Sequence, residues 1–274
     1  MIRRNTLQFP PPPTQKIRRH RSFATPRTIF ALILREMSAR YGRSPGGYVW
    51  AVLEPVGIIL ILAWGFSLLV RAPALGTSFM LFYATGYLPF SVYQSTSGLV
   101  SQALQYSRPL LAYPGVTWID TILARFFLNL LTVSMVTWII LTGIWWFGET
   151  KSIVTIEPIL LTMVLSAFLG LSIGCLNCFL SGMFPIWRQL WSIFTRPLFL
   201  ASGIFYTYEI LPYEAQSILW FNPLIHITAL MRKGFYPTYD PHFMSLTYVT
   251  IWILVPMTAG VLFLRKHHRD FLNA

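Results

Sequence analysis

The acidic and histidine side chains are the groups in this sequence best suited to chemistry, and their spacing forms no catalytic pattern. The nine Asp and Glu residues are scattered along the 274 residues: Glu36, Glu54, Asp120, Glu149, Glu157, Glu209, Glu214, Asp240 and Asp270. None belongs to an Asp-x-Asp or His-Glu-x-x-His arrangement of the kind that metal-assisted chemistry uses. His267 and His268 lie in a basic tail, where solvated side chains are expected. We therefore predict no catalytic residues and no metal site.

The sequence also contains no motif for nucleotide binding and no motif for a reactive thiol site. The chain has no Gly-x-x-x-x-Gly-Lys-Ser/Thr loop to hold phosphates, so we expect it neither to hydrolyse ATP by itself nor to bind a cofactor. Cys175 and Cys178 lie about one helical turn apart inside an apolar run. We expect both thiols to pack in a core, because a redox or metal site would need an aqueous setting and further ligands.

The composition indicates an all-α polytopic membrane protein. Hydrophobic residues make up 55% of the chain and charged residues 11%, against about 25% charged in soluble domains. A helix needs about 20 apolar residues to cross the hydrocarbon core of a bilayer. Long apolar runs predict six transmembrane helices, at residues 50–70, 79–99, 119–147, 156–182, 186–204 and 245–264.

The segments outside the spans have a different composition. Residues 1–24 are basic and Pro-rich, which favours an extended tail without a core. Residues 25–42 have apolar side chains at helical spacing but are too short and polar to span, so an amphipathic helix along the membrane interface is expected. Residues 50–264 form the predicted six-helix domain, and 265–274 a C-terminal tail. Between the last two spans, proline-punctuated aromatic pieces predict short re-entrant or interfacial helices.

The basic residues predict the orientation. A net charge of +12 would suggest nucleic acid in a soluble protein, but here ten of the 21 Lys and Arg residues precede Trp50, which indicates anionic lipid and not nucleic acid. Lys and Arg accumulate in cytoplasmic loops. With the N-terminus inside, 16 of them are cytoplasmic, and only Arg71, Lys151, Arg232 and Lys233 lie on the opposite side. Both termini are therefore predicted to be cytoplasmic.

Three stretches carry a resemblance to a known family. They are RYGRSPGGYVWAVLEP at Arg40–Pro55, SRPLLAYPGVTWIDTILAR at Ser107–Arg125, and a third that runs from SGIFY at Ser202–Tyr206 to WFNPLIHITALMRKGFYP at Trp220–Pro237. With the order of basic tail, interface helix, six spans and aromatic hairpin, the chain resembles the type-2 ABC exporter permeases. Within them it is most similar to the capsular polysaccharide export permeases of the inner membrane of Gram-negative bacteria, from about Arg27 to Phe271.

The resemblance implies partners that composition does not show. It implies a homodimer, two copies of a separate ATPase that binds ATP and Mg, a lipid-linked polysaccharide moved outward across the inner membrane, and a periplasmic export adaptor. Another lipid-linked polymer, such as O-antigen or teichoic acid, is the alternative cargo. A membrane-embedded acyl- or glycosyltransferase is the alternative from another class, but it would need a catalytic cluster that the sequence lacks.

Two basic regions are candidates for contact with the ATPase. Prolines and Gly115 interrupt the helix in the loop from Tyr106 to Val116, which is otherwise explained as a tight turn between spans. Its candidate coupling residues are Arg108, Leu111, Tyr113 and Pro114. The second region is the interface helix with Arg27, Arg35, Arg40 and Arg43, whose charges are equally explained by anionic lipid.

One arginine and several aromatic residues are candidates for a translocation path. Arg196 falls inside a predicted span, where a lone Arg costs about 2.5–3.5 kcal/mol and so usually faces a cavity or a partner. Either it meets anionic sugar or phosphate in the path, or it pairs with Glu54. The aromatic candidates are Trp64, Trp191, Phe194, Phe205 and Tyr206, and anchoring at the lipid interface is their alternative role.

Overall fold

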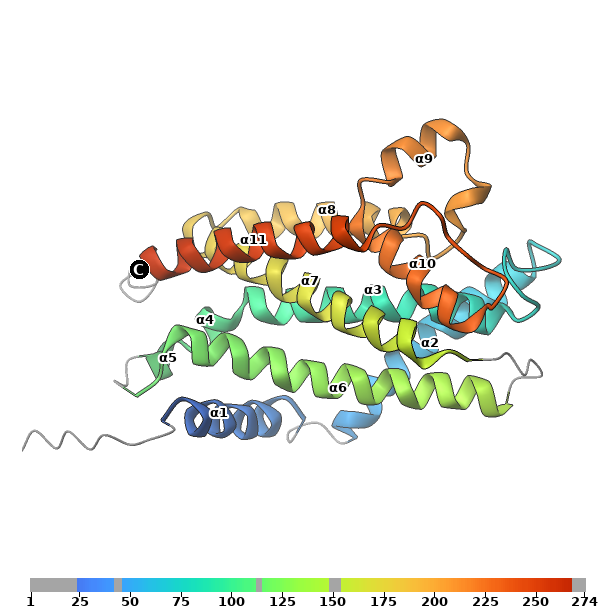
Figure 1. Cartoon of the computed structure of the whole chain (residues 1–274). Helices are drawn as coiled ribbons and strands as arrows, with labels where there is room; N and C mark the ends of the chain where they lie inside the picture. Colours follow the sequence, from blue (N-terminus) through green and yellow to red (C-terminus); the bar gives the residue numbers. More distant parts are fainter. Residues whose placement is uncertain (1–23, 42–45, 112–114, 148–153, 268–274) are drawn as a thin grey trace, which may run out of the picture.

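Most of the part of the chain that can be described is helical. The computed structural model describes residues 24–41, 46–111, 115–147 and 154–267, and within these ranges it contains eleven α-helices, one 3₁₀ turn and no β-strand. Figure 1 shows a bundle of long helices that run roughly parallel or antiparallel to one another. This agrees with the all-α class predicted from composition.

Each of the six predicted spans corresponds to a long helix. These are α2 (Gly47–Ser67), α3 (Phe79–Ser101), α6 (Trp118–Phe147), α7 (Ile156–Met183), α8 (Trp187–Ala201) and α11 (Leu246–His267). Four of them, α2, α6, α7 and α11, are both long and apolar enough to cross a membrane. Helix α3 has 23 residues but a more polar composition, and α8 has only 15. Helix α8 ends three residues before the predicted 204, and Gly203 follows it with φ of 73°, a conformation that glycine adopts readily.

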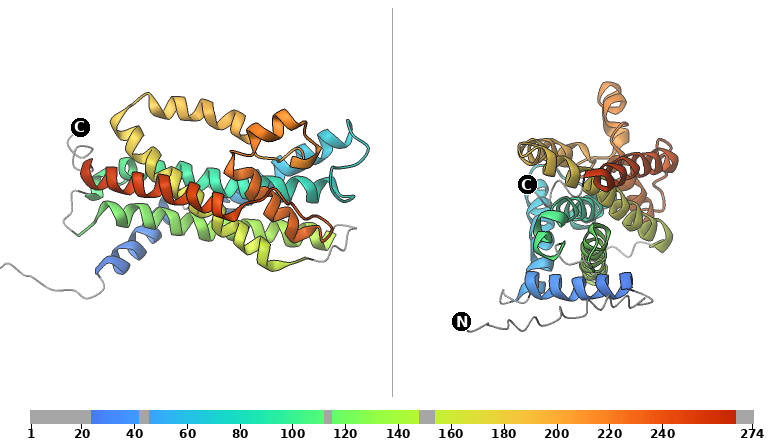
Figure 2. Two further views of the ribbon diagram at one scale, coloured as in Figure 1. Left: turned by 45° about the horizontal axis from the view of Figure 1, so that its top comes forward. Right: turned by 90° about the vertical axis from the view of Figure 1, so that its left-hand side faces the viewer.

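Small residues allow α7 to pack closely in the middle of the bundle. A methyl group added at Gly170 would lie 2.7 Å from the Tyr93 carbonyl oxygen of α3, and one added at Gly174 would lie 2.7 Å from Val100 Cβ. A methyl group added at Gly260 of α11 would lie 2.7 Å from the Leu176 backbone nitrogen of α7. Glycines four residues apart let membrane helices approach closely and gain dispersion contacts. Figure 2 shows α7 running through the bundle between its neighbours.

Short helices occupy the two long connections. Between α3 and α6 lie α4 (Ala103–Tyr106) and α5 (Arg108–Leu111). Between α8 and α11 lie a 3₁₀ turn (Tyr208–Ile210), α9 (Tyr213–Leu219) and α10 (Pro223–Phe235). Helix α9 projects from the bundle, whereas α10 is almost entirely buried and packs against α3 and α7. The prediction of short helices before the last long helix is confirmed.

Helix α1 (Ala24–Tyr41) matches the predicted segment 25–42 and lies across the bundle, packed on α6. Its apolar residues Phe30, Leu34 and Met37 are exposed. Helices α1, α4 and α5 and the last turn of α11 lie at one end of the bundle, and α9 and α10 lie at the other (Figure 1). Of the predicted tails at 1–24 and 265–274, residues 1–23 and 268–274 lie outside the described residues, while residues 265–267 belong to the last turn of α11.

Candidate functional site

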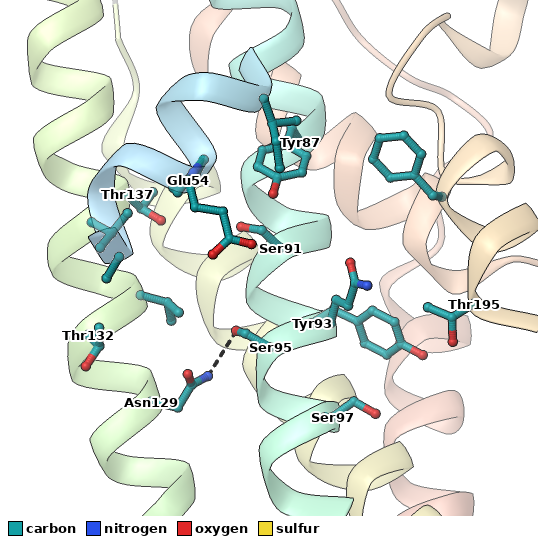
Figure 3. A pocket seen from close by; sticks show the side chains of 18 of the residues that line it. Glu54, Tyr87, Ser91, Tyr93, Ser95, Ser97, Asn129, Thr132, Thr137 and Thr195 are labelled. Carbon is teal, nitrogen blue, oxygen red and sulfur yellow. Dashed lines mark hydrogen bonds between the residues drawn. The ribbon is translucent and has the colours of Figure 1, made fainter. Parts of the chain in front are cut away.

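A cavity of about 850 Å³ lies between α2, α3, α6 and α8. This volume is within the usual range of ligand sites, about 300–1,000 Å³. Polar side chains from all four helices line its wall, and Figure 3 shows how most of them lie. They are Glu54, Tyr87, Ser91, Tyr93, Gln94, Ser95, Ser97, Asn129, Thr132, Thr137, Ser192, Thr195 and Arg196. The wall therefore offers hydroxyl, amide and charged groups among its apolar residues, which suits an occupant with both polar and apolar parts.

One side of this wall is a single face of α3. Tyr87, Ser91 and Ser95 are four residues apart, so they lie on one face. The Ser91 and Ser95 hydroxyls donate to carbonyls of the preceding turn, at 2.8 and 3.3 Å, which satisfies the donors and leaves oxygen lone pairs available. From α6, the buried Asn129 amide donates to Ser95 Oγ at 3.1 Å (Figure 3) and to Thr96 Oγ1 at 2.9 Å. This network fixes α3 against α6 beside the cavity.

Two opposite charges line the cavity without pairing. Glu54 of α2 and Arg196 of α8 are both exposed, and no ion pair joins them; in the described ranges the ion pairs are Arg125–Glu36 and Lys233–Asp240. The alternative prediction that Arg196 pairs with Glu54 is therefore wrong for this structure. Both charges line the same cavity and are available to an occupant.

Aromatic rings cluster around Phe199, which lines the cavity. Phe205 follows α8, and its ring centroid lies 5.5 Å from that of Phe66 and 5.4 Å from that of Phe199. The Phe199 ring also packs on Phe90 at 5.2 Å, and it lies on the cavity wall. Tyr83 completes the group, 6.4 Å from Phe205. These five residues are called the aromatic cluster below.

A buried arginine holds the turn that carries Phe205. Arg232 of α10 donates to the carbonyl oxygens of Tyr206 at 2.7 Å and Ile204 at 3.2 Å, and its guanidinium lies 4.2 Å from the centre of the Phe82 ring. It is 2% exposed, and burial lowers its pKa to about 10, so it remains a cation at neutral pH. The sequence placed Arg232 in an outer loop. In the structure it is instead a buried residue that fixes the turn.

Comparison with known proteins identifies the family. The family model described as "ABC-2 type transporter" matches residues 27–236, well over half of the chain. The chain belongs to the ABC-2 type transporter family. The resemblance found in the sequence is therefore confirmed. The family match favours a transport permease over the alternative hypothesis of a membrane-embedded transferase. The buried free thiols of Cys175 and Cys178 agree with packing in the core of this transporter.

Curated relatives match most of the transporter's length. The polysialic acid transport protein KpsM of Escherichia coli is 31% identical over 247 residues, which cover 90% of this chain and 96% of the relative. The capsule polysaccharide export inner-membrane protein CtrC of Neisseria meningitidis is 25% identical, covering 86% and 89%. The protein BexB of Haemophilus influenzae, with the same description, is 25% identical, covering 88% and 91%.

The structure brings together only some of the transporter's predicted path residues. Arg196 and Trp191 both line the cavity, and the Trp191 ring is stacked on Trp187 at 6.2 Å. Phe205 lies in the aromatic cluster. The Tyr206 hydroxyl donates to the Leu200 carbonyl at 2.9 Å, beside that cluster. The remaining two, Trp64 and Phe194, are 70% and 62% exposed on α2 and α8 and are not part of the cavity wall.

Those of the predicted ATPase-contact residues that the structure describes lie on α1 and α5, at the opposite end from α10 (Figure 1). Arg108 is exposed and Leu111 half-buried on α5, while Tyr113 and Pro114 lie outside the described residues. On α1, Arg27 and Arg35 are exposed. The backbone of Arg40 belongs to the same helix, but the structure does not describe its side chain. Arg43 lies outside the described residues. Sequence reasoning missed the hydroxyl-rich face of α3, although the four-residue spacing from Tyr87 to Ser95 was readable.

Proposed function

We propose that this chain is the membrane permease subunit of an ATP-driven ABC exporter that moves capsular polysaccharide across the inner membrane. The observation that carries the proposal is the similarity, over about nine-tenths of the chain, to proteins named for polysialic acid transport and capsule polysaccharide export. The polar cavity supports it, because a glycan offers many hydroxyl groups to a wall of hydroxyl and amide side chains.

The working exporter contains two copies of this permease and two copies of a separate ATPase that binds ATP and Mg. The ATPase docks on the end that carries α4 and α5, where Arg108, Leu111, Tyr113 and Pro114 form the coupling loop. Helix α1, with Arg27, Arg35 and Arg40, lies along the cytoplasmic face of the membrane beside it, and Arg43 contributes to the same contact. The arrangement of α1 across the bundle supports this placement, since an interfacial helix lies in the membrane plane.

The translocation path lies where the two permease copies meet. All six long helices span the membrane, including the more polar α3 and the short α8, and both termini are cytoplasmic. The exposed Trp64 and Phe194 belong to α2 and α8, two of the helices that wall the cavity, and they face the second copy. The glycan, still linked to its lipid, passes Arg196 and Trp191 and leaves between Phe205 and Tyr206. A periplasmic adaptor continues the route.

The experiment is complementation of a capsule-negative strain that lacks its own permease and makes an acidic polymer. Arg196→Ala removes a charge-assisted hydrogen bond worth about 1.5–3 kcal/mol, so export should fall roughly 10-fold or more. The matched control Arg71→Ala removes an exposed arginine outside the cavity and should leave export within about twofold. Polymer at the cell surface and in the cytoplasm is measured with an antibody. Failure of the unaltered chain to restore surface polymer would refute the proposal.

A further inference from the structure

Arg125 joins three helices at the end of the bundle that carries the coupling loop. It lies near the beginning of α6, and its side chain is only 6% exposed. Its guanidinium forms an ion pair with Glu36 Oε1 of α1 at 2.6 Å and donates to the Leu99 carbonyl of α3 at 3.3 Å. The same group lies 4.6 Å from the centre of the Tyr106 ring of α4. A single buried cation thus contacts the interface helix, a spanning helix and the loop.

Glu36 is the point at which α1 meets this cation. Its side chain is 24% exposed, and it lies on the same face of α1 as the half-buried Leu32 and Ile33. Arg27 and Arg35 belong to the same helix, but both are exposed and do not lie on this packed face. Since α1 packs mainly on α6, the Glu36–Arg125 pair is a directional contact within that interface, and α1 makes a second polar contact where Thr28 Oγ1 donates to the Gly115 carbonyl at 3.5 Å.

The short helix α4 is also held on a second side. The Arg188 guanidinium, at the start of α8, donates to Gln105 Oε1 at 2.5 Å. Trp187 beside it donates to Asn177 Oδ1 of α7 at 2.9 Å. The segment that leads into α5 is therefore bound to α6 through Tyr106 and to α8 through Gln105. A displacement of α4 would be felt by both helices.

We propose that Arg125 and Glu36 are positioning residues that make α1 and the α4–α5 segment move as one unit when the ATPase acts on the coupling loop. The inference rests on the proposed function. Helix α1 leads into α2, and Ala51, Glu54 and Pro55 of α2 line the cavity. Movement of the unit therefore reaches the cavity wall from two directions, through α2 and through α8.

The test uses the complete transporter, purified with its ATPase and returned to lipid vesicles. Two quantities are measured: ATP hydrolysed, and polymer moved per ATP hydrolysed. Glu36→Leu and Arg125→Met should each lower polymer moved per ATP at least fivefold, while the ATPase still copurifies and hydrolyses ATP. Because both act on the same contact, the double variant should be no worse than Arg125→Met, and the two losses should not multiply. A residue that only stabilises the fold would lower the ATP hydrolysed and the polymer moved in proportion, and would leave the polymer moved per ATP unchanged.

Matched variants make the result decisive. Lys233→Met breaks an exposed ion pair at the other end of the bundle and should leave polymer per ATP unchanged. Glu36→Gln keeps an acceptor oxygen for Arg125 and should show an intermediate loss. It also serves if Glu36→Leu fails to assemble. Wild-type coupling in Glu36→Gln and Glu36→Leu, or multiplied losses in the double variant, would overturn the inference alone. Absence of ATP-dependent transport by the unaltered complex would instead overturn the proposed function.

Discussion

Replacing Gly170 by Ala should loosen the contact between α7 and α3. The new methyl carbon would lie 2.7 Å from the Tyr93 carbonyl oxygen and 2.7 Å from Thr96 Cβ, whereas ordinary carbon contacts are 3.5–4.0 Å. Neither obstacle is the free end of a flexible side chain, so the two helices must separate by roughly 1 Å. Such overpacking costs about 3 kcal/mol at the upper end of its usual range. The higher helix propensity of Ala returns about 1 kcal/mol, which leaves a net loss of about 2 kcal/mol.

The assay is thermal unfolding of the purified chain in detergent. A loss of about 2 kcal/mol predicts a fall in Tm of roughly 4–8 °C. Gly143→Ala is the matched control, because Gly143 lies within α6 and a methyl group there would meet nothing within 4 Å. It should keep or raise Tm. If Gly170→Ala melted at or above the unaltered chain, the close approach of α7 and α3 would not be a determinant of stability.

Two further predictions concern the buried polar groups of α10. Arg232→Met leaves the Ile204 and Tyr206 carbonyls unpaired, at about 1–3 kcal/mol each, so Tm should fall clearly, whereas Lys233→Met should change it little. Burial lowers the pKa of His226, whose Nε2 lies 2.8 Å from the Trp220 carbonyl and whose Nδ1 accepts from the Ser245 amide at 3.3 Å. Its stabilisation is therefore complete above the unfolded pKa of about 6.5 and is lost as pH falls below it, so Tm should drop between pH 7.5 and 5.5. His226→Asn should weaken that drop, and an equal drop in both chains would contradict the assignment.

The long helices were predictable because apolar runs of about 20 residues have few alternatives in a membrane. The six expected segments and the helix at 25–42 all exist, with ends shifted by a few residues. Gly170 and Gly174 are four residues apart, which is typical of a closely packed helix. Their spacing does not show which helix packs against them. The partners, Tyr93 and Val100, lie more than 70 residues away.

The residues that needed the structure are those whose role depends on distant chain segments. Arg232 and Lys233 are adjacent basic residues, yet the first is buried against carbonyls of the Gly203 turn and the second is an exposed partner of Asp240. The contacts of Arg125 could not be predicted from its charge. Its partner Glu36 lies 89 positions earlier in the chain, and Tyr106 belongs to another helix. Charge counting treats all of these alike, because burial arises from packing between elements.

Packing between helices also explains why α3 lines the cavity and why it is less apolar than α7 or α11. Helix α3 is surrounded by α2, α6, α7 and α10, so few of its side chains can meet lipid. Hydroxyl and amide groups are tolerated there because they bond to the preceding turn or to Asn129, and do not face hydrocarbon unsatisfied. The low hydropathy of α3 thus accompanies a position away from lipid and beside the cavity. Helix α3, which is too polar to look like a membrane span, accordingly contributes five of the nine hydroxyl groups on the cavity wall, and α6 and α8 contribute two each.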